Sequence, residues 1–264
     1  MSFQYIDKIA VELEGIYLKR SIEDLLTEEP DDVKVKEDGS IHINKGIEIT
    51  TYNNKTIRKE ETNIAFGVLD ENTPVERAGG LLGRELVPRL PYSQLDDLKK
   101  WIIKYYPVAI NETCGFHIHV SFKSIRHYNN LMEEEFYKFF LERMKNFANT
   151  YEFDKHSNDK ERLMYRLSGR NRFAAKVFIP DYQCKEMKGN YHRYTQLNFS
   201  YKVHNTIECR LFPMFTRVET ALAAVEELIK TYCDYLDKLY KNQEKKEKAI
   251  ITKSIPVTGG KACV

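Results

Sequence analysis

The side chains best suited to chemistry lie in one short segment and share one side of it. Residues 114–122 read CGFHIHVSF. In a β-strand His117, His119 and Ser121 would point to one face, and the apolar residues between them to the other, because successive side chains alternate. An imidazole can serve as a metal ligand or a general base. The segment therefore predicts a strand with one face in the core and one face at a functional site.

Carboxylates follow the same alternation in segments far from this strand. In VELEG (11–15) and TIECRLF (206–212), glutamates alternate with apolar residues, and SIHIN (40–44), GIEIT (46–50) and YTQLNFSY (194–201) alternate in the same way. The polar sides contain no lysine and collect the following residues: Glu12, Glu14, Glu48, His117, His119, Gln196, Asn198, Glu208 and Arg210. A donor set of several carboxylates and an imidazole suits Mg²⁺ or Mn²⁺ better than Zn²⁺. Two ions about 3.5 to 4 Å apart would form a clamp for a phosphoryl group.

Three arginines are candidates for binding an anion at such a site. Arg210 shares its strand face with Glu208, and its planar guanidinium fits a carboxylate or a phosphate. Arg170 and Arg172, in LSGRNRF (167–173), follow a predicted helix end at Gly169. A surface Glu–Arg pair and a solvated arginine loop are the structural alternatives.

The remaining periodicity predicts the elements that position these residues. Helical spacing is clearest over 93–105, 130–151 and 216–242. Helices at intervals among strands with one apolar face predict an α+β fold, with a mainly antiparallel sheet, helices on one face and a polar, metal-binding opposite face. No linker divides the chain, so we expect a single catalytic domain over 1–242 and a lysine-rich tail over 243–264.

Composition excludes several classes of protein. The 264 residues include 41 Lys and Arg against 39 Asp and Glu, and a net charge of +2 gives no reason to expect nucleic acid as a partner. Five scattered cysteines without a C-x-x-C pair argue against a disulfide framework or a thiolate zinc site. No apolar segment is long enough to cross a membrane, and the first residues do not read as a signal peptide, so a cytoplasmic location is expected.

The order of these motifs resembles the amidoligase family of carboxylate–amine ligases, which are related in fold to glutamine synthetase and glutamate–cysteine ligase. The resemblance covers about residues 9 to 240, and its most specific part is CGFHIHV. The other matching segments are Glu-x-Glu at 12–14, DGSI at 38–41, ELVPRLP at 85–91 and TIECR at 206–210. The resemblance implies ATP and Mg²⁺ (or Mn²⁺) as cofactors.

The resemblance also implies a role for individual residues. Glu12, Glu14, His117 and Glu208 match the family's metal ligands, and His119 matches a histidine near the nucleotide; Asn198 is expected beside the cofactor. Arg210 matches the arginine that contacts the acidic substrate or acyl phosphate, and Arg170 and Arg172 are added as catalytic cations. Glu48 and Glu85 both fit the middle metal ligand. Glu85 is preferred because Pro88 and a predicted helix from Ser93 follow it, although the insertion between Asp38 and Glu85 departs from the family pattern.

The predicted function is therefore an ATP- and Mg²⁺-dependent ligase that joins a small-molecule or peptide carboxylate to an amine through an acyl phosphate. One alternative is a two-histidine phosphoesterase using His119 and Ser121 (HVS) with His204 and Thr206 (HNT). Another is a binding scaffold of the same fold without catalysis. The identity of the acid and the amine, and the oligomeric state, are left open.

Overall fold

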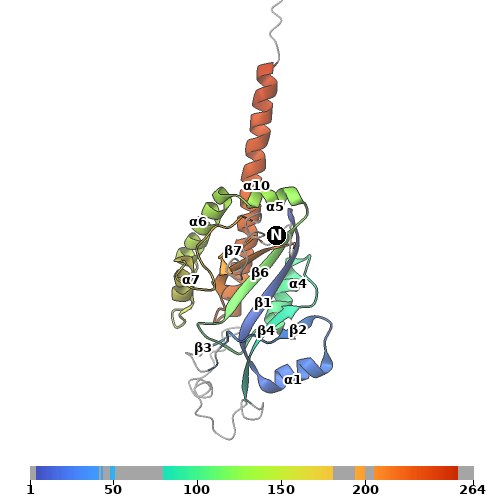
Figure 1. Cartoon of the computed structure of the whole chain (residues 1–264), viewed down its shortest axis with the longest axis vertical. Coiled ribbons are helices and arrows are strands. Elements are labelled where there is room, and N and C mark those ends of the chain that lie inside the picture. The colour runs from blue at the N-terminus through green and yellow to red at the C-terminus, as the bar shows by residue number, and fades with distance from the viewer. Residues whose placement is uncertain are drawn as a thin grey trace, which may run out of the picture.

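The computed structural model describes residues 4–41, 43, 48–50, 80–180, 194–199 and 205–254. Within these ranges the chain is α+β, and all pairs of named strands are antiparallel. The strands are β1 (Ile6–Leu18), β2 (Val33–Lys36), β3 (Glu48–Ile49), β4 (Leu81–Pro88), β5 (Ala109–Ile110), β6 (Gly115–Phe122), β7 (Leu197–Asn198) and β8 (Ile207–Pro213). Their main order is β2-β4-β1-β6-β8-β7, and the short β5 pairs with β1 and β3 (Figure 1). The predicted antiparallel sheet is confirmed.

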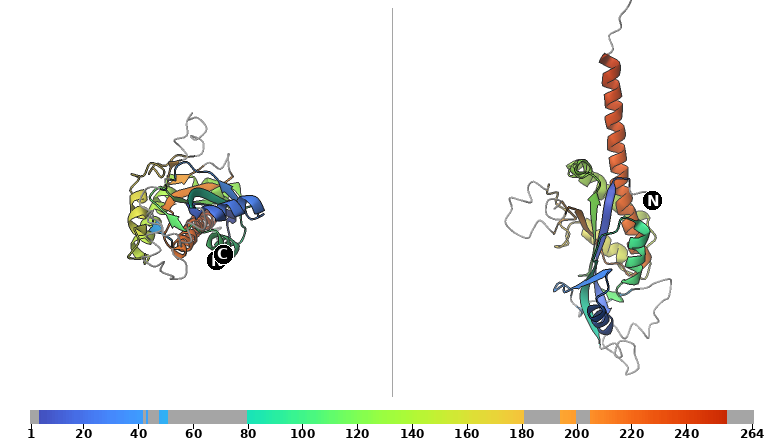
Figure 2. Two further views of the ribbon diagram at one scale, coloured as in Figure 1. Left: turned by 90° about the horizontal axis from the view of Figure 1, so that it is seen from below. Right: turned by 90° about the vertical axis from the view of Figure 1, so that its right-hand side faces the viewer.

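Six described helices surround the sheet. They are α1 (Lys19–Glu28), α4 (Leu95–Lys104), α5 (Ile125–Leu131), α6 (Glu134–Thr150), α7 (Asp159–Leu167) and α10 (Val218–Ser254). The helix predicted over 93–105 is α4, and the region predicted over 130–151 contains the end of α5 and all of α6. Side views place α4 and the first part of α10 on the same side of the sheet (Figure 2). α6 packs against α10 and α7, and α7 packs against β8.

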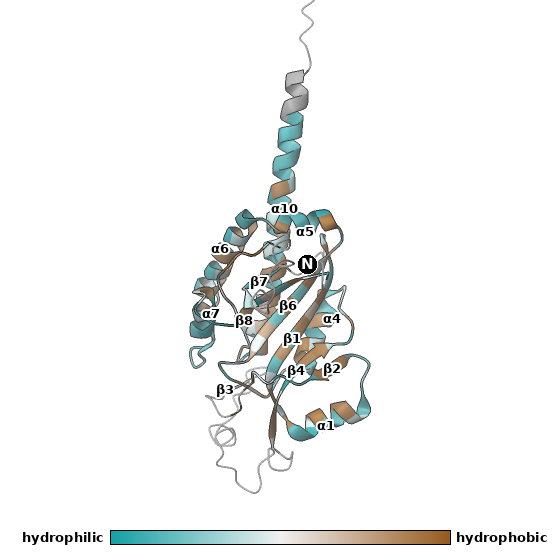
Figure 3. Cartoon of the chain, in the orientation of Figure 1, coloured by the Kyte–Doolittle hydropathy of each residue, from teal (hydrophilic) through white to brown (hydrophobic). Residues whose placement is uncertain are grey.

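The apolar positions of the strands form the core, as their alternation predicts. Val11, Leu13, Phe116, Ile118 and Val120 are all at most 1% exposed. The alternation of hydropathy along β1 and β6 is visible in Figure 3. At about 25 cal/mol for each Å² of apolar surface removed from water, this layer is the main source of stability for the fold.

Helix α10 extends beyond its predicted end at residue 242 and reaches Ser254. Residues 243–254 contain neither Gly nor Pro, and Glu244 and Lys248 have the i,i+4 spacing that stabilises a helix. Their lack of an apolar stripe explains why periodicity did not reveal them. The outer part of α10 projects away from the sheet (Figure 1). Among the described helices, none combines enough length with enough apolar character to cross a membrane.

Three strand predictions are realised only in part or not at all in the described residues. Residues 46–50 contribute the two-residue β3, and Gly46 and Ile47 lie outside the described residues. Residues 194–201 contribute the two-residue β7, and Ser200 and Tyr201 lie outside the described residues. In the segment 40–44, Ile41 and Ile43 are described and are not in a strand, whereas His42 and Asn44 lie outside the described residues. Strand β2 was not predicted. Of residues 85–91, which were expected only to lead into a helix, residues 85–88 form the end of β4.

Candidate metal and anion site

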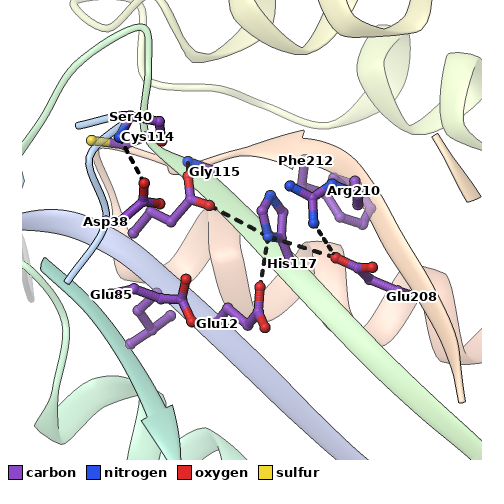
Figure 4. A network of polar contacts seen from close by, with 12 residues as sticks. Glu12, Asp38, Ser40, Glu85, Cys114, Gly115, His117, Glu208, Arg210 and Phe212 are labelled. Atoms are coloured by element: carbon purple, nitrogen blue, oxygen red, sulfur yellow. Dashed lines mark hydrogen bonds and ion pairs between the residues drawn. The ribbon is translucent and has the colours of Figure 1, made fainter. Parts of the chain in front are cut away.

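Strand register brings the predicted site residues to one face of the sheet. Glu14 of β1 lies opposite Glu85 of β4, and Glu12 lies opposite His117 of β6. On the other side of β6, His119 pairs with Glu208 of β8. Figure 4 shows Glu12, Glu85, His117 and Glu208 pointing toward a common space. Four strands that are distant in sequence therefore contribute to a single acidic surface.

The first candidate ligand group consists of Glu12, His119 and Glu208. One ligand atom from each lies within 4.8 Å of the other two. The Nε2 atom of His119 is buried, lies 3.3 Å from Oε1 of Glu12, and has no hydrogen-bond partner within the described ranges. A buried donor or acceptor without a partner costs free energy, so this atom is available for a ligand.

His117 joins this group to its neighbour. Its Nδ1 lies 2.8 Å from Oε2 of Glu12, 3.5 Å from Oε1 of Glu14 and 3.8 Å from Oε1 of Glu208. The side chain is only 2% exposed. The ligand group above contains His119, which was expected near the nucleotide, and not His117, so the role of His117 as a metal ligand stays a prediction.

The second candidate ligand group consists of Glu14, Asp38 and Glu85, whose ligand atoms also lie within 4.8 Å of one another. Asp38 comes from DGSI (38–41), a segment of the family resemblance that gave Asp38 no role. Its Oδ1 accepts a 2.8 Å hydrogen bond from the backbone N–H of Ser40. Three carboxylates form an oxygen donor set of the kind that hard divalent cations prefer.

One lysine does lie on the polar face, contrary to the prediction. Lys36 of β2 pairs with Glu85 across the strands, and its Nζ lies 2.6 Å from Oε1 of Glu85 and 3.6 Å from Oε1 of Glu12. No sequence pattern pointed to it, because β2 was not predicted. Its ammonium group partly neutralises the carboxylates, and because the side chain is 38% exposed it can swing toward solvent.

The charges of the site compensate one another. Burial alone would raise the pKa of Glu12, but its hydrogen bond with His117 and its contact with His119 lower that pKa overall. Burial would also raise the pKa of Glu208, but the charges of Arg210 and His119 lower that pKa overall. At His119 the nearby carboxylates raise the pKa in spite of burial. For Glu85, burial and then the charge of Glu12 raise the pKa. A divalent ion bound here would compete with protons for these imidazole and carboxylate groups.

Arg210 and Asn198 both hold Glu208. Nη1 of Arg210 forms an ion pair with Oε1 of Glu208, and Nδ2 of Asn198 donates a 2.9 Å hydrogen bond to Oε2. The guanidinium of Arg210 is nearly buried, and its Nε has no hydrogen-bond partner in the described part of the chain. Arg210 therefore retains a donor near the carboxylates, as an anion-binding role requires. The expected contact of Asn198 with a cofactor stays a prediction.

A bulge in β8 sets the position of Arg210. Between the pairs Phe116–Phe212 and Ile118–Cys209 the register shifts, so β8 holds one residue more than β6. The buried guanidinium of Arg166 donates to the backbone oxygens of Arg210 at 3.1 Å, Phe212 at 3.0 Å and Cys114 at 3.2 Å. Burial lowers the pKa of Arg166 to about 10. Sequence reasoning missed this residue, because nothing local marks a helical arginine whose partners are carbonyl groups of distant strands.

Gly115 allows the close approach of Glu14 and His117. Its backbone N–H donates to Oε2 of Glu14. A Cβ atom at this position would lie 2.5 Å from Nε2 of His117 and 2.8 Å from Oε2 of Glu14. A larger residue would therefore displace side chains of the site.

Two adjoining hollows lie at this surface. The first, here called the carboxylate pocket, has a volume of about 220 Å³ and is lined by Glu12, Glu14, Glu37, Asp38, Gly39, Ser40, Glu85, Thr113, His117, Arg166, Phe173, Tyr194 and Arg210. The second, here called the arginine cavity, has a volume of about 680 Å³ and is lined by Glu112, Thr113, Glu161, Arg162, Tyr165, Arg166, Arg170, Asn171, Arg172, Phe173 and Pro213. Arg170 and Arg172 thus line the adjoining cavity and not the carboxylate pocket.

The alternative middle ligand, Glu48, lies apart from these groups. Its carboxylate accepts hydrogen bonds from Asn158, at 3.1 Å from the side chain, and contacts Arg162 at 3.4 Å. Glu85, the preferred candidate for the middle ligand, lies in the Glu14–Asp38–Glu85 group, and its role as a metal ligand stays a prediction. Of the residues in the phosphoesterase alternative, Ser121 contacts the backbone of Lys8, and His204 lies outside the described residues.

Comparison of the chain with protein-family models, with curated proteins and with solved structures found no match. The geometry of the site is therefore the basis for assigning a function.

Proposed function

We propose that this protein is an ATP- and Mg²⁺-dependent carboxylate–amine ligase with a fold like that of the glutamine synthetase catalytic domain. The observation that carries the proposal is the presence of two neighbouring three-ligand groups, Glu12–His119–Glu208 and Glu14–Asp38–Glu85, on one sheet face. His117 lies between them, and Arg210 borders them. Paired divalent ions beside a buried arginine are a common arrangement for phosphoryl transfer.

The residues present fit Mg²⁺ or Mn²⁺. Their donors are mostly carboxylate oxygens. The Nε2 atom of His119, which has no hydrogen-bond partner in the described part of the chain, gives one group a nitrogen that Mn²⁺ also accepts. Magnesium bound here would neutralise the phosphate oxygens of ATP and the charge that develops on them during transfer.

The proposed reaction has two balanced steps. An oxygen of the substrate carboxylate forms a bond to the γ-phosphorus of ATP, and ADP leaves with the electron pair of the broken P–O bond. The amine nitrogen then attacks the acyl carbon, phosphate leaves, and the nitrogen gives up a proton.

The main role of the protein in this reaction is to position charged groups. Arg210 offers an N–H donor to the acid or its acyl phosphate, while its ion pair with Glu208 keeps the guanidinium in place. Arg166 fixes the backbone of the bulge from which Arg210 projects. A preorganised donor of this kind stabilises charge without reorganising during the reaction.

The test is amine-dependent release of ADP from Mg·ATP with a panel of acids and amines. Glu12→Gln and Glu208→Gln should lower the rate at least about 100-fold while the protein stays folded, because each removes a charged ligand. Glu142→Gln, on an exposed position of α6, is the matched control and should keep the wild-type rate. Undiminished activity in the site variants would contradict the proposal, and phosphodiester cleavage in EDTA would favour the two-histidine alternative.

A further inference from the structure

Lys36 places one positive charge against both candidate ligand groups. It is the last residue of β2 and lies directly opposite Glu85, so the two side chains project from the same face of the sheet. Its Nζ lies 2.6 Å from Oε1 of Glu85, in the second ligand group, and 3.6 Å from Oε1 of Glu12, in the first. A single ammonium therefore contacts one carboxylate of each group.

The contact with Glu12 spans a whole strand. β4 lies between β2 and β1 in the sheet, so Lys36 and Glu12 belong to strands two positions apart. Because adjacent strands are about 4.8 Å apart, the two side chains together bridge roughly 10 Å or more. β2 also ends the main strand order, where a lysine could turn toward water at no cost. Lys36 instead lies along the sheet, toward the carboxylates.

Lys36 and Arg210 are the lysine and arginine side chains that form ion pairs with these two groups in the described ranges, and they differ in mobility. The side chain of Arg210 is 8% exposed and its partner Glu208 is 9% exposed. The side chain of Lys36 is 38% exposed, and its four-carbon stem is flexible. Arg210 is thus fixed beside its ligand, whereas Lys36 has room to leave.

The chain that follows Lys36 supplies a ligand whose position does not depend on the lysine. Asp38 comes two residues later and belongs to the second ligand group. Its Oδ1 accepts a hydrogen bond from the backbone N–H of Ser40. Departure of the lysine side chain therefore leaves Asp38 in place.

We propose that Lys36 is a built-in competitor for divalent cations, which holds the carboxylates together in the metal-free protein and has to leave Glu85 before the second ligand group binds an ion. The inference rests on the metal sites of the proposed function. Carboxylates clustered without a cation repel one another, and the ammonium relieves this repulsion. Its effect should be larger on the second group, where the distance is 2.6 Å, than on the first, where it is 3.6 Å.

The test is titration of the full-length protein and three variants with Mn²⁺, with the free ion measured by electron paramagnetic resonance. Lys36→Met has a side chain of similar length without the charge. It should bind Mn²⁺ about tenfold more tightly at one of the two sites, which is the low end of the usual effect of groups next to metal ligands. Lys36→Arg keeps the positive charge and should show no such gain. The control Lys34→Met removes the same charge from an exposed position of β2 whose side chain alternates to the other face, and it should bind Mn²⁺ as the wild type does.

Thermal unfolding gives a second readout, which a merely structural role of Lys36 would not produce. Without metal, Lys36→Met should melt a few degrees below the wild type, because the repulsion among the carboxylates is no longer offset. Saturating Mn²⁺ should raise its melting temperature by more than that of the wild type, so that the difference closes. A purely structural loss would lower the melting temperature equally with and without Mn²⁺, and this would contradict the inference.

The outcomes separate this inference from the proposed function. Mn²⁺ binding that is unchanged or weaker in Lys36→Met, or equally tightened in Lys34→Met, would overturn the inference even if ADP is released from Mg·ATP. Tighter binding in Lys36→Met alone, with no amine-dependent release of ADP, would support the inference and count against the ligase. If neither the wild type nor Lys36→Met binds Mn²⁺, the inference and the metal sites of the proposed ligase are both wrong.

Discussion

The two faces of the sheet use the same strands to bury opposite kinds of side chain. On the apolar face Leu13 and Ile118 are fully buried. Their neighbours in sequence on the polar face, Glu14 and His117, are only 6% and 2% exposed. Both faces are therefore shielded from water, which distinguishes this sheet from one whose polar face is simply solvated.

The difference between the faces separates stability from function. Burying apolar surface stabilises the fold, whereas burying charge costs free energy unless the charge is paired. Glu12, Glu14, Glu85 and Glu208 are kept near one another by Lys36, Arg210 and two histidines, which together offset only part of the carboxylate repulsion. Substitutions on the apolar face should thus change stability, and substitutions on the polar face should change ligand binding.

The largest expected effect on stability is at the apolar face. Phe116→Ala removes a ring that is fully buried, so the free energy of unfolding should fall by about 3 to 5 kcal/mol. Urea denaturation followed by circular dichroism measures this. A loss below about 1 kcal/mol would mean that this face is not the source of stability described here.

The next largest expected effect on stability is at the bulge of β8 that Arg166 holds in place. Arg166→Met leaves three buried carbonyl groups without their donor and should lower the free energy of unfolding by about 3 kcal/mol. Arg166→Lys keeps a charge and some donors, so it should lose less. The same urea titration compares the two variants, and equal losses would show that hydrogen bonding at the bulge is not what Arg166 provides.

Divalent cations should add stability only through the polar face. With Mn²⁺ at 100 times its dissociation constant, the gain is about 2.7 kcal/mol for one site. Glu85→Gln should keep the metal-free melting temperature within a few degrees, because its burial and the charge of Glu12 already disfavour its ionised form. The variant should lose about half of the shift caused by Mn²⁺, because the Glu12–His119–Glu208 group is left intact. A shift of wild-type size in Glu85→Gln would remove Glu85 from the ligands.

The smallest expected effect on stability is at the exposed ion pair of Asp32 and Lys104, which lies outside the site. Asp32 lies 2.8 Å from Nζ of Lys104 and accepts a 2.6 Å hydrogen bond from Tyr105, and these contacts lower its pKa although its burial acts in the opposite direction. A lowered carboxyl pKa contributes stability above the ordinary value of about 3.9, and this stability is lost as the pH falls through the lower folded value. Because the pair is exposed, the contribution at pH 7 is less than about 1 kcal/mol.

The measurement is thermal unfolding of Asp32→Asn across pH 2 to 7. The variant should be slightly less stable than the wild type at pH 7, and the difference should vanish at the acid end. Asp31→Asn, at an exposed neighbouring position, is the control and should match the wild type throughout. A difference that grows as the pH falls would have the wrong sign for this account.

Much of the site was predictable because alternation along a strand is a local signal. Glu12 and Glu14, His117 and His119, and Glu208 and Arg210 could each be assigned to a polar face from the residues beside them. Which strands are neighbours is not local information. The resemblance offered Glu85 as a middle metal ligand without a strand partner, and the structure pairs it with Glu14.

The parts that sequence could not reveal depend on long-range partners. Lys36 enters the site only because β2 pairs with β4. Arg166 looks like an ordinary helical arginine, and its role arises from a bulge between β6 and β8. Asp38 belonged to a recognised segment, but its place beside Glu14 and Glu85 depends on the path of the chain after β2.

The most direct test of the central claim is a count of Mn²⁺ ions bound per chain, by electron paramagnetic resonance of free and bound ion. The account predicts two ions for the wild type. It predicts one fewer for Glu208→Gln, which disrupts the Glu12–His119–Glu208 group alone. Failure of the wild type to bind Mn²⁺, or an unchanged count in that variant, would contradict the claim that these two groups hold divalent cations.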